Sequence, residues 1–172
     1  ELNRNKNHRI VIKAIASLKN PKLHYVICGQ GQLENELKIL IRELGLQKHV
    51  HLLGYRKDIV EICKVSDVFI FPSYREGLSV ALMEAMSIGL PIICSNIRGN
   101  LDLVENDVGG YLLNPNDVEA FQTKINILFK DKAKRKSMGL NNLNSIRDYD
   151  LKNVNRKLHS IYRECFQDND NS

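Results

Sequence analysis

The chain has 172 residues, of which 43% are apolar and 26% charged, and its formal net charge is +5. These values are typical of a single soluble globular domain and exclude a low-complexity or fibrous chain. The basic residues are spread along predicted helices rather than clustered with aromatic residues, which argues against nucleic-acid binding. The four cysteines form no C-x-x-C pair, so they predict no zinc or disulfide framework.

The chain opens with a polar segment and a predicted helix. Leu2 is predicted to end a strand, and Asn7 is suited to cap a helix over residues 8–19, whose apolar positions have helical spacing. This abrupt, polar beginning predicts the absence of a signal peptide and a fragment that starts at a domain boundary. Lys6 lies just before the helix, where a simply solvated lysine is the plainer alternative.

Alternating strands and helices follow. Strands are predicted over 23–28 and 50–53, and helices over 33–44 and 58–65. Gly29-Gln30-Gly31 follows the first strand, and a bare G-x-G only permits close approach of a ligand to the backbone. Tyr55 and Arg56 follow the second strand at its carboxyl end, where open α/β sheets bind ligands.

The most informative stretch covers residues 67–94. Residues 67–71 predict a buried strand, 78–88 a helix rich in Ala, Leu and Met, and 90–94 the next strand. Gly89 ends the helix and Pro91 follows it. Strand, loop, helix and strand in this order predict a βαβ crossover with parallel strands.

Two carboxylates mark this crossover. Glu76 lies in the loop, and Glu84 is the lone charge of the predicted helix, where it is costly unless it is hydrogen-bonded. Between them, the backbone N–H groups of Gly77, Leu78 and Ser79 are predicted to open the helix and to form an anion site. Carboxylate, anion site and carboxylate match the order of sugar, diphosphate and ribose along a nucleotide sugar.

Plainer interpretations of the same residues stay open. Glu84 could pair with a structural Arg or Lys, and Glu76 could be a solvated loop acid. Residues 77–97 are also long enough to imitate a membrane span. Glu84 in the middle of that stretch, with Gly89 and Pro91 interrupting it, favours a buried core instead.

The remaining chain is predicted to be mostly helical. A loop is predicted over 97–100, a strand over 110–113, helices over 117–129, 133–142 and 151–166, and a disordered tail over 167–172. The expected domain is therefore 1–166. Asp148-Tyr149-Asp150 and Asp168-Asn169-Asp170 imitate metal-binding Asp-x-Asp motifs, but solvated acids are the simpler interpretation.

The chain resembles retaining glycosyltransferases of the family-4 type. The resemblance rests on Glu76 and Glu84 within PSYREGLSVALMEAMSIGLPII, and on the blocks ELNRNKNH, ICGQGQLENEL, HLLGYRKDIVEICKVSDV and IRGNLDLVEN in the same order. It covers residues 1–115, and the helical tail more loosely. It implies a doubly wound, mostly parallel, Rossmann-like α/β sheet with C-terminal helices, which is the donor-binding half of a GT-B enzyme.

The resemblance also implies roles for single residues. Lys6 would contact the donor diphosphate, Glu76 would be the catalytic residue that holds a hydroxyl of the donor sugar, and Glu84 would hold the ribose hydroxyls. The family often has an Arg where this chain has Glu1, and Arg4 is the candidate substitute.

Further donor contacts are implied from Gly29, Tyr55 and Arg56, mostly through backbone atoms. Many relatives carry Gly-Gly where this chain has Gly99-Asn100. The Asn100 side chain could face the sugar or the acceptor, or the residue could merely adopt a left-handed turn. The expected donor is a UDP-sugar. No cofactor and no metal are expected, because Lys6 and the helix terminus supply positive charge.

The expected function is retaining transfer of a sugar from a nucleoside-diphosphate sugar to a hydroxyl acceptor in bacterial surface-polysaccharide synthesis. The expected partners are an N-terminal acceptor domain of the same protein, absent from this chain, and a lipid-linked or glycan acceptor. The expected location is the cytoplasm, or the inner face of the membrane as a peripheral protein. A nucleotide-binding module without transfer activity and a nucleoside-diphosphate-sugar epimerase-like protein remain as alternatives.

Overall fold

The computed structural model describes residues 1–149, 153, 155–156, 159 and 162–163. In chain order the elements are η1 (Arg4–Lys6), α1 (His8–Leu18), β1 (Tyr25–Cys28), α2 (Glu34–Glu43), β2 (Val50–Gly54), α3 (Ile59–Lys64), β3 (Phe69–Phe71), α4 (Val80–Ser87), β4 (Ile92–Ser95), α5 (Arg98–Leu101), β5 (Gly110–Leu113), α6 (Val118–Lys130), α7 (Lys132–Ser145) and η2 (Ile146–Tyr149). The predicted helix over 151–166 lies largely outside the described residues. The predicted tail and the second Asp-x-Asp motif lie wholly outside them.

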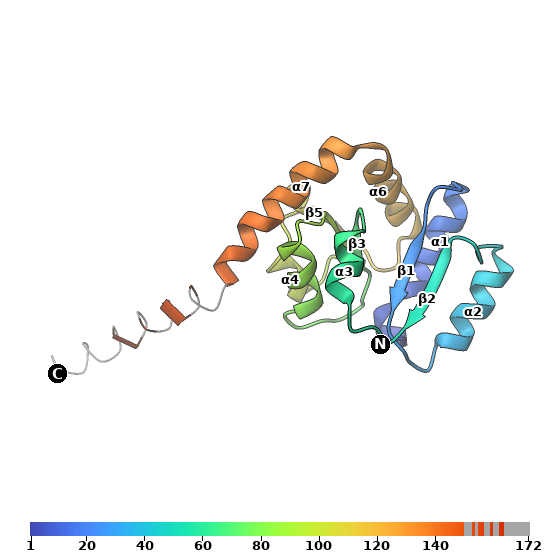
Figure 1. Ribbon diagram of the computed structural model, residues 1–172, viewed down its shortest axis with the longest axis horizontal. Helices are drawn as coiled ribbons and strands as arrows, with labels where there is room; N and C mark the ends of the chain where they lie inside the picture. Colours follow the sequence, from blue (N-terminus) through green and yellow to red (C-terminus); the bar gives the residue numbers. More distant parts are fainter. Residues whose placement is uncertain (150–152, 154, 157–158, 160–161, 164–172) are drawn as a thin grey trace.

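The strands among the described residues all run parallel, which confirms the predicted class of doubly wound α/β fold. They form two hydrogen-bonded groups rather than one sheet: β1 with β2, and β3, β4 and β5 with β4 in the middle. Figure 1 shows β2 and β1 on one side of β3, and β5 on the other. From the middle of the fold, the strand order therefore runs outward through β1 and β2 on one side and through β3, β4 and β5 on the other. In folds of this class, ligands bind at the loops that follow the carboxyl ends of the strands.

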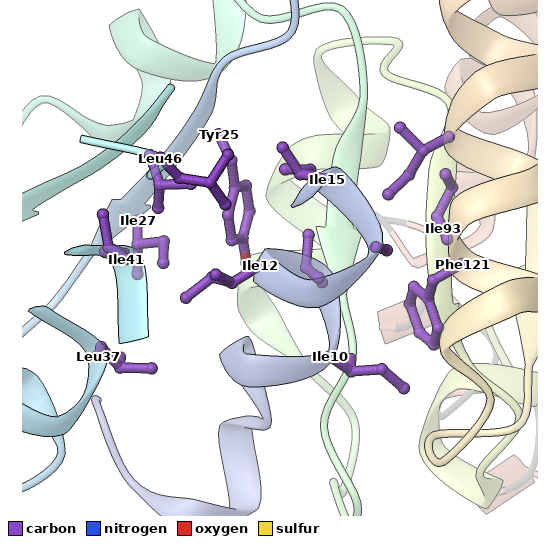
Figure 2. Close-up of a cluster of buried hydrophobic side chains, with 14 of the residues drawn as sticks. Ile10, Ile12, Ile15, Tyr25, Ile27, Leu37, Ile41, Leu46, Ile93 and Phe121 are labelled. Carbon is purple, nitrogen blue, oxygen red and sulfur yellow. The ribbon is translucent and has the colours of Figure 1, made fainter. Parts of the chain in front are cut away.

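The larger hydrophobic core lies around α1. Val11, Ile12, Ala14 and Ile15 of this helix are buried, as their helical spacing predicts. Figure 2 shows α1 between the β1 residues Tyr25 and Ile27 on one side and Phe121 of α6 on the other. This packing anchors the start of α1, and therefore the residues just before it.

The second core cluster lies on the opposite face of β3 and β4, beneath α3 and α4. It contains Leu82 and Met86 of α4 together with Ile92 and Cys94 of β4, whereas Ile93 belongs to the larger core. Every residue of β4 is buried, because neighbouring side chains of a strand point to opposite faces and both faces are covered.

Several local predictions are wrong. Leu2 belongs to no strand; its N–H donates to the Gln30 carbonyl and its own carbonyl accepts from Leu33 N–H. Gly31 packs so tightly there that an added Cβ would lie 2.4 Å from the Leu2 oxygen. Residues 98–101 form the short helix α5 instead of a loop.

The stretch over 77–97 is not one continuous helix. It is divided among a loop, α4, a turn at Gly89 with φ +80°, and β4. In the part of the chain that the structure describes, no helix is both long and apolar enough to cross a membrane.

Candidate functional site

Three loops meet at the carboxyl ends of β3 and β5. The Asn7 side chain joins them, because its amide nitrogen donates to the carbonyls of Pro72 at 3.2 Å and Pro115 at 2.8 Å. Pro72 follows β3, and Pro115 lies two residues after β5. Asn7 was predicted to cap α1, but its side chain makes no capping hydrogen bond and its backbone is left-handed, with φ 50°.

Lys6 and Glu76 lie at the centre of these loops. Lys6 Nζ is 2.7 Å from Glu76 Oε1, and the two side chains are only 25% and 15% exposed. The same ammonium lies 5.1 Å from the centre of the Phe71 ring. Partial burial makes such a charged hydrogen bond stronger than a surface ion pair. The structure thus brings together two residues that are 70 positions apart and that the sequence placed in one site.

Asn5 holds the Lys6 turn against the Glu76 loop. Its amide nitrogen donates to the Arg75 carbonyl at 2.8 Å, and its amide oxygen accepts from Arg75 N–H at 3.0 Å. The Asn5 carbonyl also accepts from Tyr74 N–H at 2.8 Å. Sequence reasoning missed Asn5, because nothing local distinguishes it from any other loop asparagine.

The helix that follows Glu76 begins later than predicted. Helix α4 begins at Val80, and Ser79 is its N-cap, with Oγ accepting from Leu82 N–H. The N–H groups of Ser79, Val80 and Ala81 therefore have no intrahelical acceptor. Gly77, Leu78 and Ser79 form the approach to the helix rather than its first turn.

Gly77 and Gly99 are in backbone contact. A Cβ on Gly99 would lie 2.0 Å from the Gly77 oxygen and 2.8 Å from the Glu76 oxygen, so only glycine fits. A Cβ on Gly77 would meet nothing within 4 Å. Helix α5 thus supports the Glu76-Gly77 peptide from behind and leaves its other side open.

Asn100 lies within the short helix α5. It is fully buried, its amide nitrogen donates to the Ser95 carbonyl at 2.9 Å, and its backbone is helical. The predicted left-handed turn is therefore wrong, while the predicted contact with sugar or acceptor stays a prediction. The buried Asn100 Oδ1, Ser95 Oγ and Ser73 Oγ have no hydrogen-bond partner among the described residues.

A second group of predicted site residues lies at the ends of β1 and β2. Gly29 has φ +140° and Gly54 has φ +67°, and Gly29 N–H donates to the Gly54 carbonyl at 2.7 Å. Tyr55, the next residue, is 68% exposed. Arg56 forms a two-pronged ion pair with Asp58 and holds the pKa of that carboxyl below its usual range. Nε and Nη2 of the Arg56 guanidinium therefore already donate to Asp58.

Glu84 is exposed on α4, so the expected cost of burying its charge does not arise. Its surroundings are nevertheless informative. Burial raises the pKa of the Cys63 thiol, and the nearby Cys28 and Glu84 raise it further. Glu84 of α4 and Cys28, the last residue of β1, thus both lie near Cys63 of α3.

Two basic residues close to Lys6 in the sequence differ in what they contact. Arg4 is exposed, and it takes part in no ion pair in the described part of the chain. His8 Nδ1 lies 3.0 Å from Tyr25 Oη, and burial, aided by the positive charges of the N-terminus and Lys6, lowers its pKa to about 4. His8 is thus neutral at physiological pH, which no local pattern around it indicates.

Metal ligands do not gather in this site. No group of three or more His, Cys, Asp or Glu side chains within residues 1–149 or the other described positions is placed to hold a metal ion. The charges that converge on the loops are Lys6 and the N-terminal end of α4.

The family model of glycosyl transferases group 1 matches residues 1–144. The chain belongs to this family. A group 1 relative in Escherichia coli, the UDP-Gal:alpha-D-GlcNAc-diphosphoundecaprenol alpha-1,3-galactosyltransferase, is 47% identical over 102 residues, which are 59% of this chain and 26% of that protein. A Campylobacter jejuni N-acetylgalactosaminyltransferase that acts on a diphospho-undecaprenol-linked sugar is 32% identical over 157 residues, which are 86% of this chain and 43% of that protein. The chain thus spans less than half the length of these relatives.

Solved structures show the same fold. Anabaena HepE in complex with UDP has a TM-score of 0.88 and 25% sequence identity, over 95% of this chain and 47% of that chain. The C-terminal domain of a Francisella tularensis group 1 glycosyl transferase has a TM-score of 0.77 and 22% identity, over 87% of this chain and 83% of that chain.

Proposed function

We propose that this group 1 glycosyltransferase chain is the donor-binding domain, over residues 1–166, of a two-domain enzyme. The enzyme moves a sugar, with retention of anomeric configuration, from a UDP-sugar to a hydroxyl of a lipid-linked or glycan acceptor in bacterial surface-polysaccharide synthesis. The observation that carries the proposal is the Lys6–Glu76 pair at the carboxyl ends of the strands. The UDP complex of HepE and the diphosphoundecaprenol in the names of the relatives support the donor and acceptor classes.

The diphosphate lies at Lys6 and at the N-terminal end of α4 in this proposal. The bond between the anomeric carbon and the diphosphate oxygen breaks, and its electron pair leaves with the diphosphate. Lys6 and the free N–H groups of α4 stabilise that developing charge. The acceptor oxygen bonds to the anomeric carbon, and its proton passes to the departing diphosphate oxygen. Glu76 is the catalytic residue that holds a hydroxyl of the donor sugar and orients the ring.

The nucleoside lies toward β1 and β2 in the same proposal. Glu84 accepts hydrogen bonds from the ribose hydroxyls, and its exposure leaves the carboxylate accessible to a ligand. The base lies against the backbone of Gly29 and Tyr55, because Asp58 already occupies the Arg56 guanidinium. Gly99 contributes by supporting the Glu76-Gly77 peptide rather than by touching the sugar.

The acceptor site belongs to another part of the enzyme. The relatives are more than twice as long as the segment they share with this chain. The whole enzyme acts in the cytoplasm at the inner face of the membrane, where a lipid-linked acceptor is found.

Titration of this chain with UDP, followed by calorimetry, tests the proposal. We expect binding, and we expect Lys6→Met to weaken it about tenfold, as loss of a charged hydrogen bond does. Lys13→Met is the matched control, because Lys13 is an exposed lysine of α1. The proposal fails if the wild-type chain binds no nucleoside diphosphate, or if Lys13→Met weakens binding as much as Lys6→Met.

A transfer assay separates the enzyme from a module that only binds nucleotide. We expect this chain alone to transfer no sugar to a lipid-linked acceptor, because transfer requires the acceptor oxygen within about 3–3.5 Å of the anomeric carbon. The longer parent protein should show turnover with the same donor and acceptor. Turnover by this chain at the parent's rate would contradict the two-domain proposal.

A further inference from the structure

We propose that Asn5 and Asn7 are positioning residues that hold Lys6 opposite Glu76 and thereby set the affinity for the donor diphosphate. This inference rests on the proposed function, because it takes Lys6 as the diphosphate contact. The two asparagines are the residues immediately before and after Lys6. Each of them is hydrogen-bonded to the chain that carries or borders Glu76.

Asn5 joins the residues that precede the two members of the ion pair. It is bonded to Arg75 in both directions, through its amide nitrogen at 2.8 Å and its amide oxygen at 3.0 Å. A third bond runs from Tyr74 N–H to the Asn5 carbonyl at 2.8 Å. Asn5 precedes Lys6, and Arg75 precedes Glu76. These three bonds therefore set the distance between the backbone of Lys6 and the backbone of Glu76.

Asn7 secures the other side of Lys6. Its amide nitrogen bonds the carbonyls of Pro72 and Pro115, and the residue is 9% exposed. Its φ of 50° lies in the left-handed region, where glycine is the least strained residue and asparagine is among the better tolerated others. A glycine would satisfy the backbone here, so the asparagine adds two bonds that glycine lacks.

Both bonded neighbours reduce the freedom of Lys6 before a ligand arrives. A lysine side chain loses substantial rotamer entropy when it is immobilised. If the turn that carries it is already ordered, ligand binding costs less conformational entropy. The carboxamides therefore act through Lys6 and do not touch the diphosphate themselves.

Asn142 provides a matched control within the same chain. Its amide nitrogen also bonds two backbone carbonyls, those of Leu90 and Gly109, both at 2.7 Å, and it is 1% exposed. Leu90 and Gly109 precede β4 and β5, so this bridge lies at the amino ends of the strands, opposite the Lys6–Glu76 pair. Loss of the Asn142 bridge lowers stability without changing the position of Lys6.

The experiment measures UDP affinity by calorimetry and thermal stability for Asn7→Gly, Asn5→Ala and Asn142→Ala. Asn7→Gly keeps the left-handed backbone and deletes only the carboxamide. We expect Asn7→Gly and Asn5→Ala each to weaken UDP binding by about five- to tenfold, and Asn142→Ala to lower the melting temperature while leaving UDP affinity unchanged. Equal UDP affinity in Asn7→Gly and wild type would overturn the inference for Asn7. Equal UDP affinity in Asn5→Ala and wild type would overturn it for Asn5.

A double-mutant cycle shows whether the asparagines act through Lys6. In a Lys6→Met background, Asn7→Gly should cost no further UDP affinity. A full additional loss there would show a direct or purely structural role and would overturn the inference. If wild type binds UDP and Lys6→Met weakens it while both asparagine variants bind normally, the inference fails and the proposed function stands.

A second measurement needs no nucleotide. The rate at which an acylating reagent modifies Lys6, followed by mass spectrometry, reports how well its ammonium is held. We expect faster modification in Asn7→Gly and Asn5→Ala than in wild type, and no change in Asn142→Ala. Unchanged Lys6 reactivity in both asparagine variants would overturn the inference even if UDP does not bind.

Discussion

The ammonium of Lys6 and the carboxylate of Glu76 form one ion pair of 2.7 Å at the point where the loops after β3 and before α1 meet. A diphosphate that takes Lys6 as its counter-ion must share this ammonium with Glu76. A sugar hydroxyl that binds Glu76 must in turn share the carboxylate with Lys6. In the proposed binding mode, recognition of the diphosphate and recognition of the sugar are therefore linked through this ion pair.

Glu76→Gln tests this link. The substitution removes the charge that competes for Lys6, so we expect UDP affinity to stay the same or to rise. It also weakens the contact with the sugar hydroxyl, so the advantage of UDP-sugar over UDP should fall about three- to tenfold. Calorimetry with both ligands measures the ratio, and Glu105→Gln, at an exposed acid outside the proposed site, should leave it unchanged. A clear drop in UDP affinity in Glu76→Gln would contradict the linkage.

Glu84→Gln tests the ribose contact. Because Glu84 is exposed, we expect a modest loss of about 0.5–1.5 kcal/mol in UDP binding. The loss should vanish when the ligand is a UDP analogue without ribose hydroxyls. Glu61→Gln, at an exposed acid of α3, is the control and should change neither affinity. Equal losses for UDP and the analogue would place Glu84 away from the ribose.

Removal of divalent metal tests the charge balance of the site. Lys6 and the N-terminal end of α4 supply positive charge where the diphosphate is proposed to lie. We therefore expect UDP affinity to be the same within about twofold in EDTA and in magnesium, since no bridging cation is needed. Binding that disappears in EDTA and returns with magnesium would refute this prediction.

His8 gives the fold a predictable dependence on pH. Burial lowers its pKa from 6.5 to about 4, so between these values the unfolded chain binds a proton that the folded chain does not. Stability contributed by the neutral imidazole is therefore present above pH 6.5 and is lost as the pH falls toward 4. The loss at pH 4 is on the order of 1–3 kcal/mol.

Urea denaturation of wild type and His8→Gln between pH 7 and pH 4 measures this effect. As the pH falls, the unfolding free energy of wild type should decrease more than that of His8→Gln. The contributions of the other titrating groups cancel in this comparison. A wild-type and His8→Gln difference that stays constant over this range would show that His8 is not held neutral by the fold.

The local pattern of residues was sufficient to predict most helices and strands. Spacing of apolar side chains indicated α1, and the apolar run over 90–94 indicated the strand β4. These features depend on neighbours within a few positions, so they can be recognised without knowing the fold. Errors occurred at element ends, as at Leu2 and at the start of α4, where the choice depends on which backbone groups find partners.

The residue types of the candidate site were likewise visible in the sequence, but their arrangement was not. Glu76, Lys6 and the glycines stood out by type and order. That Asn7 donates to carbonyls 65 and 108 positions away, and that the Asn100 side chain is buried and donates to the Ser95 carbonyl, were decided by the tertiary structure. A polar side chain takes the partner that the folded chain brings within about 3 Å, and no local pattern encodes that distance.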